Sequence, residues 1–187
     1  MNQKFEILSL PLAPSFLVKP FISIDNRGSF LKEFSYDFLI RNNIDFKIKE
    51  VFMTASSKNV IRAIHFQKIK EQGKIIRCVR GSIYDVIVDL RPESKNFKKH
   101  YSIELNDKNN LALFVPKGFG HGFITLTENT IVSYKVDQYY SKEQDRSIRF
   151  DDNKLKIDWK GLTPILSEKD LKAPLLKNSD VNFKYTL

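Results

Sequence analysis

Two of the three histidines stand inside strand-like segments, where an imidazole could do proton chemistry. Imidazole titrates near neutral pH and serves as a general base or a metal ligand. In segment 62–67, strict alternation places His65 and Gln67 on one face of a strand and Arg62 on the other. We interpret the first face as the polar lining of a pocket. The alternative for His65, and also for His121, is a core histidine with satisfied hydrogen bonds.

These histidines do not predict a metal centre. A catalytic metal usually takes three protein ligands, commonly with two histidines close together on one strand. The residue two positions after His65 is Gln67, and neither a cysteine nor a second histidine accompanies it. We therefore expect no metal and no other cofactor.

Two aspartates interrupt the apolar segment 82–90. Alternation places Asp85 and Asp89 on the same face as Ile83 and Ile87. Because buried carboxylates need hydrogen-bond partners, we expect both to lie at the rim of a barrel and to bond to the backbone or to arginine.

The elements that must hold these residues are predicted to be short strands. Apolar and β-branched runs alternate with turn-like pieces, and 12% of the residues are aromatic. This pattern indicates an all-β sandwich or barrel in one domain, residues 1–187, with few short helices. Helical pattern is limited to 35–42 and to a C-terminal segment that starts near Ser167. The strand-like runs are 16–24, 61–67, 74–79, 82–90, 101–105, 111–115, 122–126 and 130–136.

The chain of 187 residues carries a net charge of +9. Its Lys and Arg residues are scattered, with no run longer than two, which disfavours a nucleic-acid ligand. A phosphorylated small molecule explains the surplus, as does a lysine-rich composition without functional meaning. No run approaches the ~20 apolar residues of a membrane span. The lone Cys78 excludes an intramolecular disulfide, so we expect a cytoplasmic protein.

An ordered series of motifs resembles the dTDP-4-dehydrorhamnose 3,5-epimerase family over roughly residues 16–176. The resemblance implies a cupin-type jelly-roll barrel without a metal and a homodimer whose N-terminal strands exchange. It also implies epimerisation at C3 and C5 of a nucleotide-diphospho-4-keto-6-deoxy sugar. The motifs are Asp25-x-Arg27-Gly28-x-Phe30, segment 60–67, Gln72-Gly73-Lys74, Gly81-x-Ile83-x-Asp85-Val86-x-Val88-Asp89-Leu90-Arg91, Pro116-x-Gly118-Phe119-x-His121-Gly122-Phe123, Tyr134-Lys135, Tyr139-Tyr140 and Ile157-Asp158-Trp159.

The resemblance assigns four catalytic residues. A ketone at C4 acidifies the protons on C3 and C5, but a base with a pKa near neutrality is still needed to remove them. The family's base matches His65, its orienting carboxylate matches Asp170, and its proton donor on the opposite face of the sugar matches Tyr134. Lys74 matches the lysine that stabilises the charge on O4, a role equivalent to an oxyanion hole.

Five further residues match substrate contacts of the family. The fixed charges of Arg27 and Arg62 suit a pyrophosphate, and Gln67, His121 and Lys169 match the remaining contacts. Considered without the resemblance, several of these residues have plainer explanations. Arg27 would belong to a turn and Arg62 to a salt bridge at the rim. In the same way, Tyr134 would be a half-buried strand aromatic and Asp170 a surface residue near a helix start.

The sequence also departs from the family pattern. Ala63 stands where the family usually has glycine, Lys32 replaces an acidic residue, and segment 50–57 lacks the Gln and Asn that commonly contact thymine. These departures favour a different sugar, nucleotide or stereochemical scope. One alternative is therefore a mono-epimerase, acting at C3 or C5 only, on a GDP-, CDP- or UDP-linked 4-keto sugar, heptoses included. Another is a catalytically silent nucleotide-sugar-binding cupin, and a third is a nucleic-acid-binding β-barrel.

Overall fold

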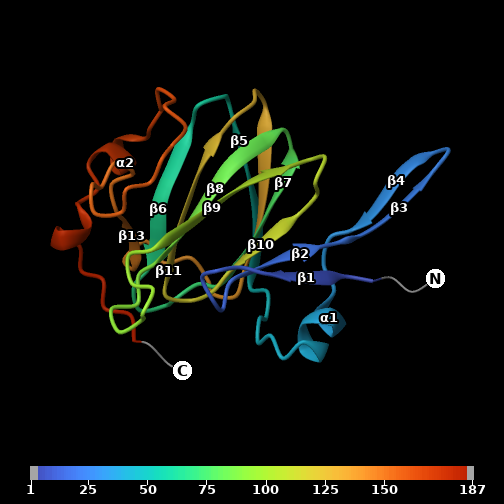
Figure 1. The fold of residues 1–187 in the computed structure, drawn as a ribbon, viewed down its shortest axis with the longest axis horizontal. Coiled ribbons are helices and arrows are strands. Elements are labelled where there is room, and N and C mark those ends of the chain that lie inside the picture. Colours follow the sequence, from blue (N-terminus) through green and yellow to red (C-terminus); the bar gives the residue numbers. More distant parts are fainter. Residues whose placement is uncertain (1–3, 185–187) are drawn as a thin grey trace.

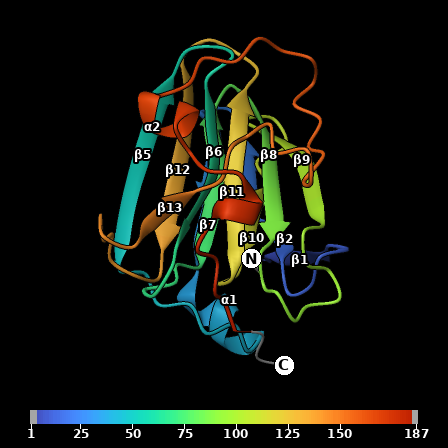
Figure 2. The same cartoon turned by 90° about the vertical axis from the view of Figure 1, so that its left-hand side faces the viewer.

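Two antiparallel sheets pack face to face in the computed structural model, which describes residues 4–184 (Figures 1 and 2). The strand order of one sheet is β1-β2-β10-β7-β12-β5, and that of the other is β13-β6-β11-β8-β9. Consecutive strands repeatedly fall into different sheets, and this two-sheet arrangement confirms the predicted cupin-type jelly roll with few short helices.

The first sheet consists of β1 (Glu6–Ser9), β2 (Phe16–Lys19), β5 (Glu50–Ser56), β7 (Lys74–Arg80), β10 (Ala112–Val115) and β12 (Thr130–Val136). The second consists of β6 (Ile61–Gln67), β8 (Ser82–Asp89), β9 (His100–Asn106), β11 (Phe119–Thr125) and β13 (Asp145–Ser147). Strands β3 (Phe21–Asp25) and β4 (Gly28–Lys32) form a separate hairpin.

Alternate residues of both sheets fill the space between them. Ile76 and Cys78 of β7 meet Ile83 and Ile87 of β8 in one buried cluster. The opposite faces of the two sheets are also covered. The C-terminal segment packs on the second sheet around Trp159, and helix α1 (Tyr36–Arg41) packs on the first. The molecule therefore has three apolar layers, and the one between the sheets surrounds the site described below.

Both predicted helices are present and are capped as the sequence indicates. The hydroxyl of Ser35 accepts a hydrogen bond from the backbone at the start of α1, and that of Ser167 does the same for α2 (Glu168–Leu171). A 3₁₀ turn at Leu176–Asn178 follows. Among the described residues, no helix has the length and apolar character that a membrane span requires.

The predicted strand 16–24 is in fact two strands, because Pro20 lies between β2 and β3. Proline has no N–H for the ladder and commonly ends a strand. β2 stays in the sandwich, whereas β3 enters a hairpin that projects from the body of the molecule (Figure 1). Two large apolar side chains of this hairpin are exposed, Ile24 by 78% and Phe30 by 59%. Such exposure suits a surface that another chain covers.

Strand β5 was not predicted as an element. Its apolar residues point alternately to both faces, so no period of two in hydrophobicity marks it. Val51 and Met53 are exposed on one face. Phe52 and Thr54 line a cavity between the sheets on the other. The segment that departs from the family pattern is thus an edge strand beside that cavity (Figure 2).

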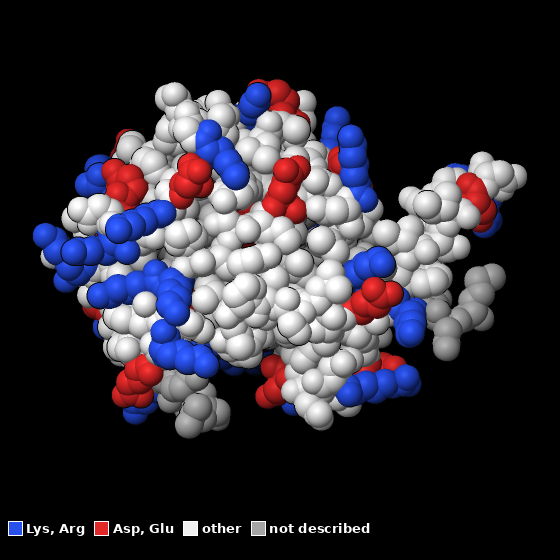
Figure 3. All heavy atoms as spheres, in the orientation of Figure 1, with Lys and Arg blue, Asp and Glu red and all other residues white. Residues whose placement is uncertain are grey.

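Charged side chains are spread around the molecule. On the face in Figure 3, Lys and Arg lie mostly toward the rim with Asp and Glu among them, and the middle of this face is largely uncharged. On this face the basic side chains do not form the continuous stripe that tracks a nucleic-acid backbone.

A close contact between β6 and β11 yields a prediction about stability. A methyl group built on Gly122 would lie 2.5 Å from the Cβ of Ala63 and 2.9 Å from the carbonyl oxygen of Arg62. We expect Gly122→Ala to destabilise the fold by about 2 kcal/mol through overpacking. That loss lowers the melting temperature by roughly 4–8 °C for a domain of this size.

The matched control moves the methyl group instead of adding one. In the double variant Ala63→Gly/Gly122→Ala, we expect only part of the lost melting temperature to return, because the Cα atom of position 63 and the carbonyl oxygen of Arg62 still lie 2.8 Å and 2.9 Å from the added methyl group. A Gly122→Ala protein that melts at the wild-type temperature in differential scanning calorimetry would show that the two strands separate without cost.

Candidate active site

The interior of the sandwich becomes polar toward one end, and a cavity of about 390 Å³ opens there. On β7, the inward series that contains Ile76 and Cys78 starts with Lys74, and on β12 the series that contains Val132 reaches Tyr134. We call this space the polar cavity. All the predicted site residues except Arg27 and Gln67 line it. The lining set comprises Arg62, His65, Lys74, His121, Tyr134, Lys169 and Asp170.

His65 and Asp170 come together from distant parts of the chain. Nε2 of His65 on β6 lies 3.0 Å from Oδ1 of Asp170 on α2. The side chain of Asp170 is 5% exposed and that of His65 is 26% exposed. The Ser167 hydroxyl accepts a hydrogen bond from the Asp170 backbone and so fixes the first turn of α2. A carboxylate this close to one ring nitrogen is the arrangement that orients an imidazole and leaves its other nitrogen to accept a proton.

Arg62 and His65 point into the same cavity, so the predicted alternation of β6 is wrong. In the ladder between β6 and β11, His65 is opposite His121 and Arg62 is opposite Phe123. Between these two pairs β6 advances by three residues and β11 by only two. The extra residue is a β-bulge, and a bulge re-aims the side chains on its two sides. The bulge brings the guanidinium of Arg62 to the site, where its Nη2 donates to Ser56 at 3.2 Å.

Lys74 is buried in the polar cavity and is 8% exposed. Its Nζ donates to the backbone carbonyl of His65 at 3.5 Å. Burial lowers the pKa of Lys74 to about 8, although the carboxylates of Asp145 and Asp85 act in the opposite direction. A buried ammonium with one long hydrogen bond can still donate to an oxygen that becomes negatively charged.

Tyr134 is enclosed by aromatic rings. Phe52 stacks on it at a centroid distance of 4.7 Å, and His121 and Phe123 lie 6.2 Å and 6.5 Å away. Burial raises the pKa of the Tyr134 phenol above its usual range, and the negative charge of Asp85 adds to the effect. The phenol therefore stays protonated at neutral pH.

A second histidine–carboxylate pair lies deeper in the sandwich, and the sequence reasoning missed its acidic partner. Nε2 of His121 lies 2.9 Å from Oδ2 of Asp85, and both side chains are almost fully buried. Burial raises the pKa of Asp85, and His121 and Lys74 oppose that rise. Only Asp89 fits the predicted bond to arginine, since it pairs with Arg91 at 2.7 Å. The signal in the sequence that could have identified Asp85 as a buried partner was its place on the same strand face as two isoleucines.

Lys169 lies at the mouth of the polar cavity and forms an ion pair with Asp145. The same carboxylate accepts a hydrogen bond from the Tyr140 hydroxyl at 3.0 Å. Asp145 therefore joins α2 to the segment that precedes β13. Sequence reasoning did not select Asp145 or Tyr140 as a pair, because their contact depends on the loop between them.

The structure does not bring the remaining two predicted residues into the polar cavity. The Gln67 amide is used within the protein, since it donates to the carbonyls of Lys70 and Tyr139 and accepts from Ser141. The predicted substrate contact of Gln67 finds no support in this geometry. Arg27 lies on the projecting hairpin, where it pairs with Asp25 at 2.6 Å.

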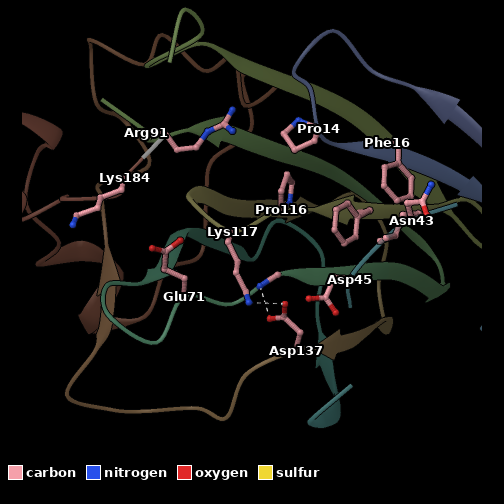
Figure 4. Close-up of a pocket in the computed structure, with 13 residues that line it drawn as sticks. Pro14, Phe16, Asn43, Asp45, Glu71, Arg91, Pro116, Lys117, Asp137 and Lys184 are labelled. Atoms are coloured by element: carbon pink, nitrogen blue, oxygen red, sulfur yellow. Dashed lines mark hydrogen bonds and ion pairs between the residues drawn. The ribbon is translucent and has the colours of Figure 1, made fainter. Parts of the chain in front are cut away.

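A larger cavity of about 480 Å³ holds none of the predicted site residues (Figure 4). Pro14, Phe16 and Pro116 form part of its wall, and Lys117 contacts Asp137 at 3.2 Å. Asp137 also accepts a hydrogen bond from the backbone of Gly73, at 2.7 Å, on the segment that leads to Lys74. Asp137 therefore connects this second cavity to the segment that precedes Lys74, and no histidine is among the described residues that line the cavity.

The donor set of the site does not match a metal centre. Within residues 4–184, no three His, Cys, Asp or Glu side chains are grouped so that they could hold a metal ion. The two histidines of the cavity each contact a different carboxylate, His65 with Asp170 and His121 with Asp85. Independence of metal stays a prediction.

A cupin-type sandwich with paired histidines, a buried lysine and a protonated phenol in its interior is the scaffold of an acid–base enzyme. The family model for dTDP-4-dehydrorhamnose 3,5-epimerase matches residues 9–178. The chain therefore belongs to the dTDP-4-dehydrorhamnose 3,5-epimerase family, and the resemblance seen in the motifs is confirmed.

Relatives with names and structures cover almost the whole chain. The dTDP-4-dehydrorhamnose 3,5-epimerase of Sinorhizobium fredii is 39% identical over 95% of this chain and 92% of its own. The dTDP-6-deoxy-D-glucose-3,5-epimerase of Legionella pneumophila, solved with dTDP-4-keto-L-rhamnose, is 31% identical with a TM-score of 0.95, over 98% and 100% of the two chains. A 3'-monoepimerase of Streptomyces bikiniensis, solved with dTDP-quinovose, is 29% identical with a TM-score of 0.85, over 91% and 87%.

The buried lysine provides a direct test of the site's electrostatics. In protein labelled with ¹³C-lysine, we expect a side-chain NMR resonance with a titration midpoint near pH 8, where Lys74 loses its charge on going to higher pH. The resonance should vanish in Lys74→Met and persist in Lys117→Met, which removes a half-exposed lysine. A Lys74 signal that titrates near the ordinary value of 10.5 would mean that water reaches the cavity freely.

Proposed function

We propose that the protein inverts C3 and C5 of a dTDP-linked 4-keto-6-deoxy sugar. The observation that carries the proposal is that the His65–Asp170 pair, Lys74 and Tyr134 line one cavity. The Legionella relative, which was solved with a dTDP-4-keto sugar, supports the choice of substrate.

His65 is the proposed base. The C4 ketone makes the neighbouring C–H bonds acidic, and His65 takes the proton while the electron pair delocalises onto O4 as an enolate. Asp170 acts through His65, because its carboxylate stabilises the imidazolium. Lys74 donates a hydrogen bond to O4, where the negative charge develops.

Tyr134 is the proposed acid on the opposite face of the sugar. Its O–H bond breaks as the new C–H bond forms, and the phenolate regains a proton from water. Arg62 has donor capacity left for the pyrophosphate, since its buried Nε has no partner among residues 4–184. His121 of β11 and Lys169 of α2 also line the cavity and are the proposed remaining substrate contacts.

The test is incubation with the dTDP-4-keto-6-deoxy sugar in deuterated water, followed by mass spectrometry and NMR of the product. Incorporation of two deuterons with inversion at both carbons supports the proposal. A single deuteron indicates a mono-epimerase, the alternative that the similarity to the Streptomyces bikiniensis enzyme favours. Binding without exchange indicates a silent nucleotide-sugar-binding protein. The same assay with GDP-, CDP- and UDP-linked sugars tests the base.

We also propose that two copies of the chain complete each other's sites. The hairpin β3–β4 projects from the body of the molecule on the side opposite α2 (Figure 1), and it carries exposed apolar residues on its strands and Arg27 in its turn. An exchanged hairpin would bury Ile24 and Phe30 and deliver Arg27 to the partner's pyrophosphate site.

A cytoplasmic location fits the lone, buried Cys78, and cell fractionation tests it.

The base assignment predicts the effect of replacing His65. Asn has similar polarity and reach, so we expect His65→Asn to fold normally and to lose exchange at C3 and C5 by roughly 10²- to 10⁴-fold. His100→Asn, on the far strand β9, is the matched control and should keep full activity. If His65→Asn retains more than about a tenth of the wild-type exchange rate, another group is the base.

The acid assignment predicts a different defect. Tyr134→Phe deletes one hydroxyl and should change stability by no more than ~1 kcal/mol. With His65 intact, solvent deuterium should still enter from the base side, so that exchange outruns inversion at one or both carbons. Tyr84→Phe, whose ring packs on the outer face of the second sheet, is the control. Inversion at the wild-type rate in Tyr134→Phe would assign the donor role elsewhere.

The proposed exchange of hairpins predicts complementation between two inactive variants. We expect His65→Asn and Arg27→Ala to lose activity separately. A heterodimer of the two, isolated with different affinity tags, should hold one intact site and about half of the wild-type activity. Either an inactive heterodimer or a monomer in light scattering at assay concentration would contradict the exchange.

A further inference from the structure

Phe52 lies against the proposed proton donor in a way that no other side chain of the cavity does. Residues Phe52 and Tyr134 are directly opposite each other on β5 and β12, so both project from the same face of the sheet. Their rings are stacked at a centroid distance of 4.7 Å and an interplanar angle of 15°. The Phe52 ring therefore lies against one face of the tyrosine ring.

The other neighbours of Tyr134 do not hold the ring in this way. His121 meets it edge to face at 81°, and Phe123 is tilted by 45° at 6.5 Å. The side chains of His121 and Phe123 are nearly fully buried, whereas that of Phe52 is 44% exposed. Phe52 therefore separates the tyrosine ring from solvent at the edge of the sheet, since β5 is the last strand there.

We propose that Phe52 is a positioning residue that aligns the Tyr134 phenol for proton delivery and thereby sets how often abstraction of a proton ends in inversion. The proposal rests on the proposed function, because it assigns Phe52 a role in the second half of that reaction. It concerns a residue in segment 50–57, where this chain departs from the family pattern.

After His65 has removed the proton, two groups compete to return hydrogen to the enolate. The enolate can regain hydrogen from His65, which restores the starting configuration, or from the Tyr134 phenol, which inverts it. Because the pKa of Tyr134 is raised by burial, its proton is released only when the hydroxyl is closely aligned with the carbon. A ring that loses its stacked neighbour samples more orientations, and return from His65 then wins more often.

The stack also controls water. Phe52 lines the polar cavity and the adjoining groove that contains Glu50, Gln72 and Tyr140. A smaller or non-planar side chain at this position would open the tyrosine face of the cavity to that groove. Water that enters there could quench the enolate without stereochemical control.

The test compares Phe52→Leu with Phe52→Tyr in the deuterium assay. Leucine keeps apolar volume but has no flat face, whereas tyrosine keeps the stack. We expect Phe52→Leu to raise the ratio of solvent exchange to inversion by about tenfold while exchange keeps at least half its rate. Phe52→Tyr should keep the ratio within about twofold of the wild-type value. Phe52→Met is a second variant for use if the leucine protein folds poorly.

Met53→Ala is the matched control, because it truncates the neighbouring exposed side chain of β5, on the opposite face of the strand. It should leave the ratio unchanged. An unchanged ratio in Phe52→Leu overturns the proposal. If both rates fall by the same factor, Phe52 only supports the fold. A wild-type protein without any exchange would instead refute the proposed function, so the two failures are distinguishable.

Discussion

The structure depends on the pairing of charges that lie between two sheets. An unpaired carboxylate or ammonium in such an interior costs several kcal/mol, so each buried charge needs a partner. Asp85 has His121, Asp170 has His65, and Lys74 lies within the influence of two carboxylates. Each pairing also fixes the orientation of a ring or an ammonium. The requirement that makes the interior stable therefore also aligns the groups that the proposed reaction uses.

Pairing explains why the C-terminal segment is part of the site. Asp170 reaches His65 only because the chain after β13 packs on the outer face of the second sheet, around Trp159 and Leu155. That apolar layer holds α2, a helix of four residues that would not be stable alone. Hydrophobic burial on one face of the sheet thus places a carboxylate at the cavity on the other.

Much of the fold was predictable because its signals are local. Ser35 and Ser167 mark helix starts, and the alternation in segment 82–90 correctly places Asp85 on the face of the interior isoleucines. The expected rim position of Asp85, with a backbone or arginine partner, is wrong, because the residue is fully buried against His121. The bulge in β6 was not predictable, because it arises from pairing with β11, 56 positions away at the matched histidines. Without it, Arg62 and His65 cannot share a face. Asp85 was found on the correct face but without its partner, since no spacing in the sequence relates it to His121.

The resemblance to a family selected the proposed catalytic residues, and burial gives a physical reason for the different roles proposed for them. Desolvation disfavours the charged form of every group. It makes Lys74 a readier hydrogen-bond donor and keeps the Tyr134 phenol protonated, which suits the roles proposed for both residues. His65 differs from both, since its side chain is a quarter exposed and lies beside the Asp170 carboxylate. One cavity therefore contains an ammonium, a protonated phenol and an imidazole at different depths of burial, which are the three groups that the proposed reaction uses.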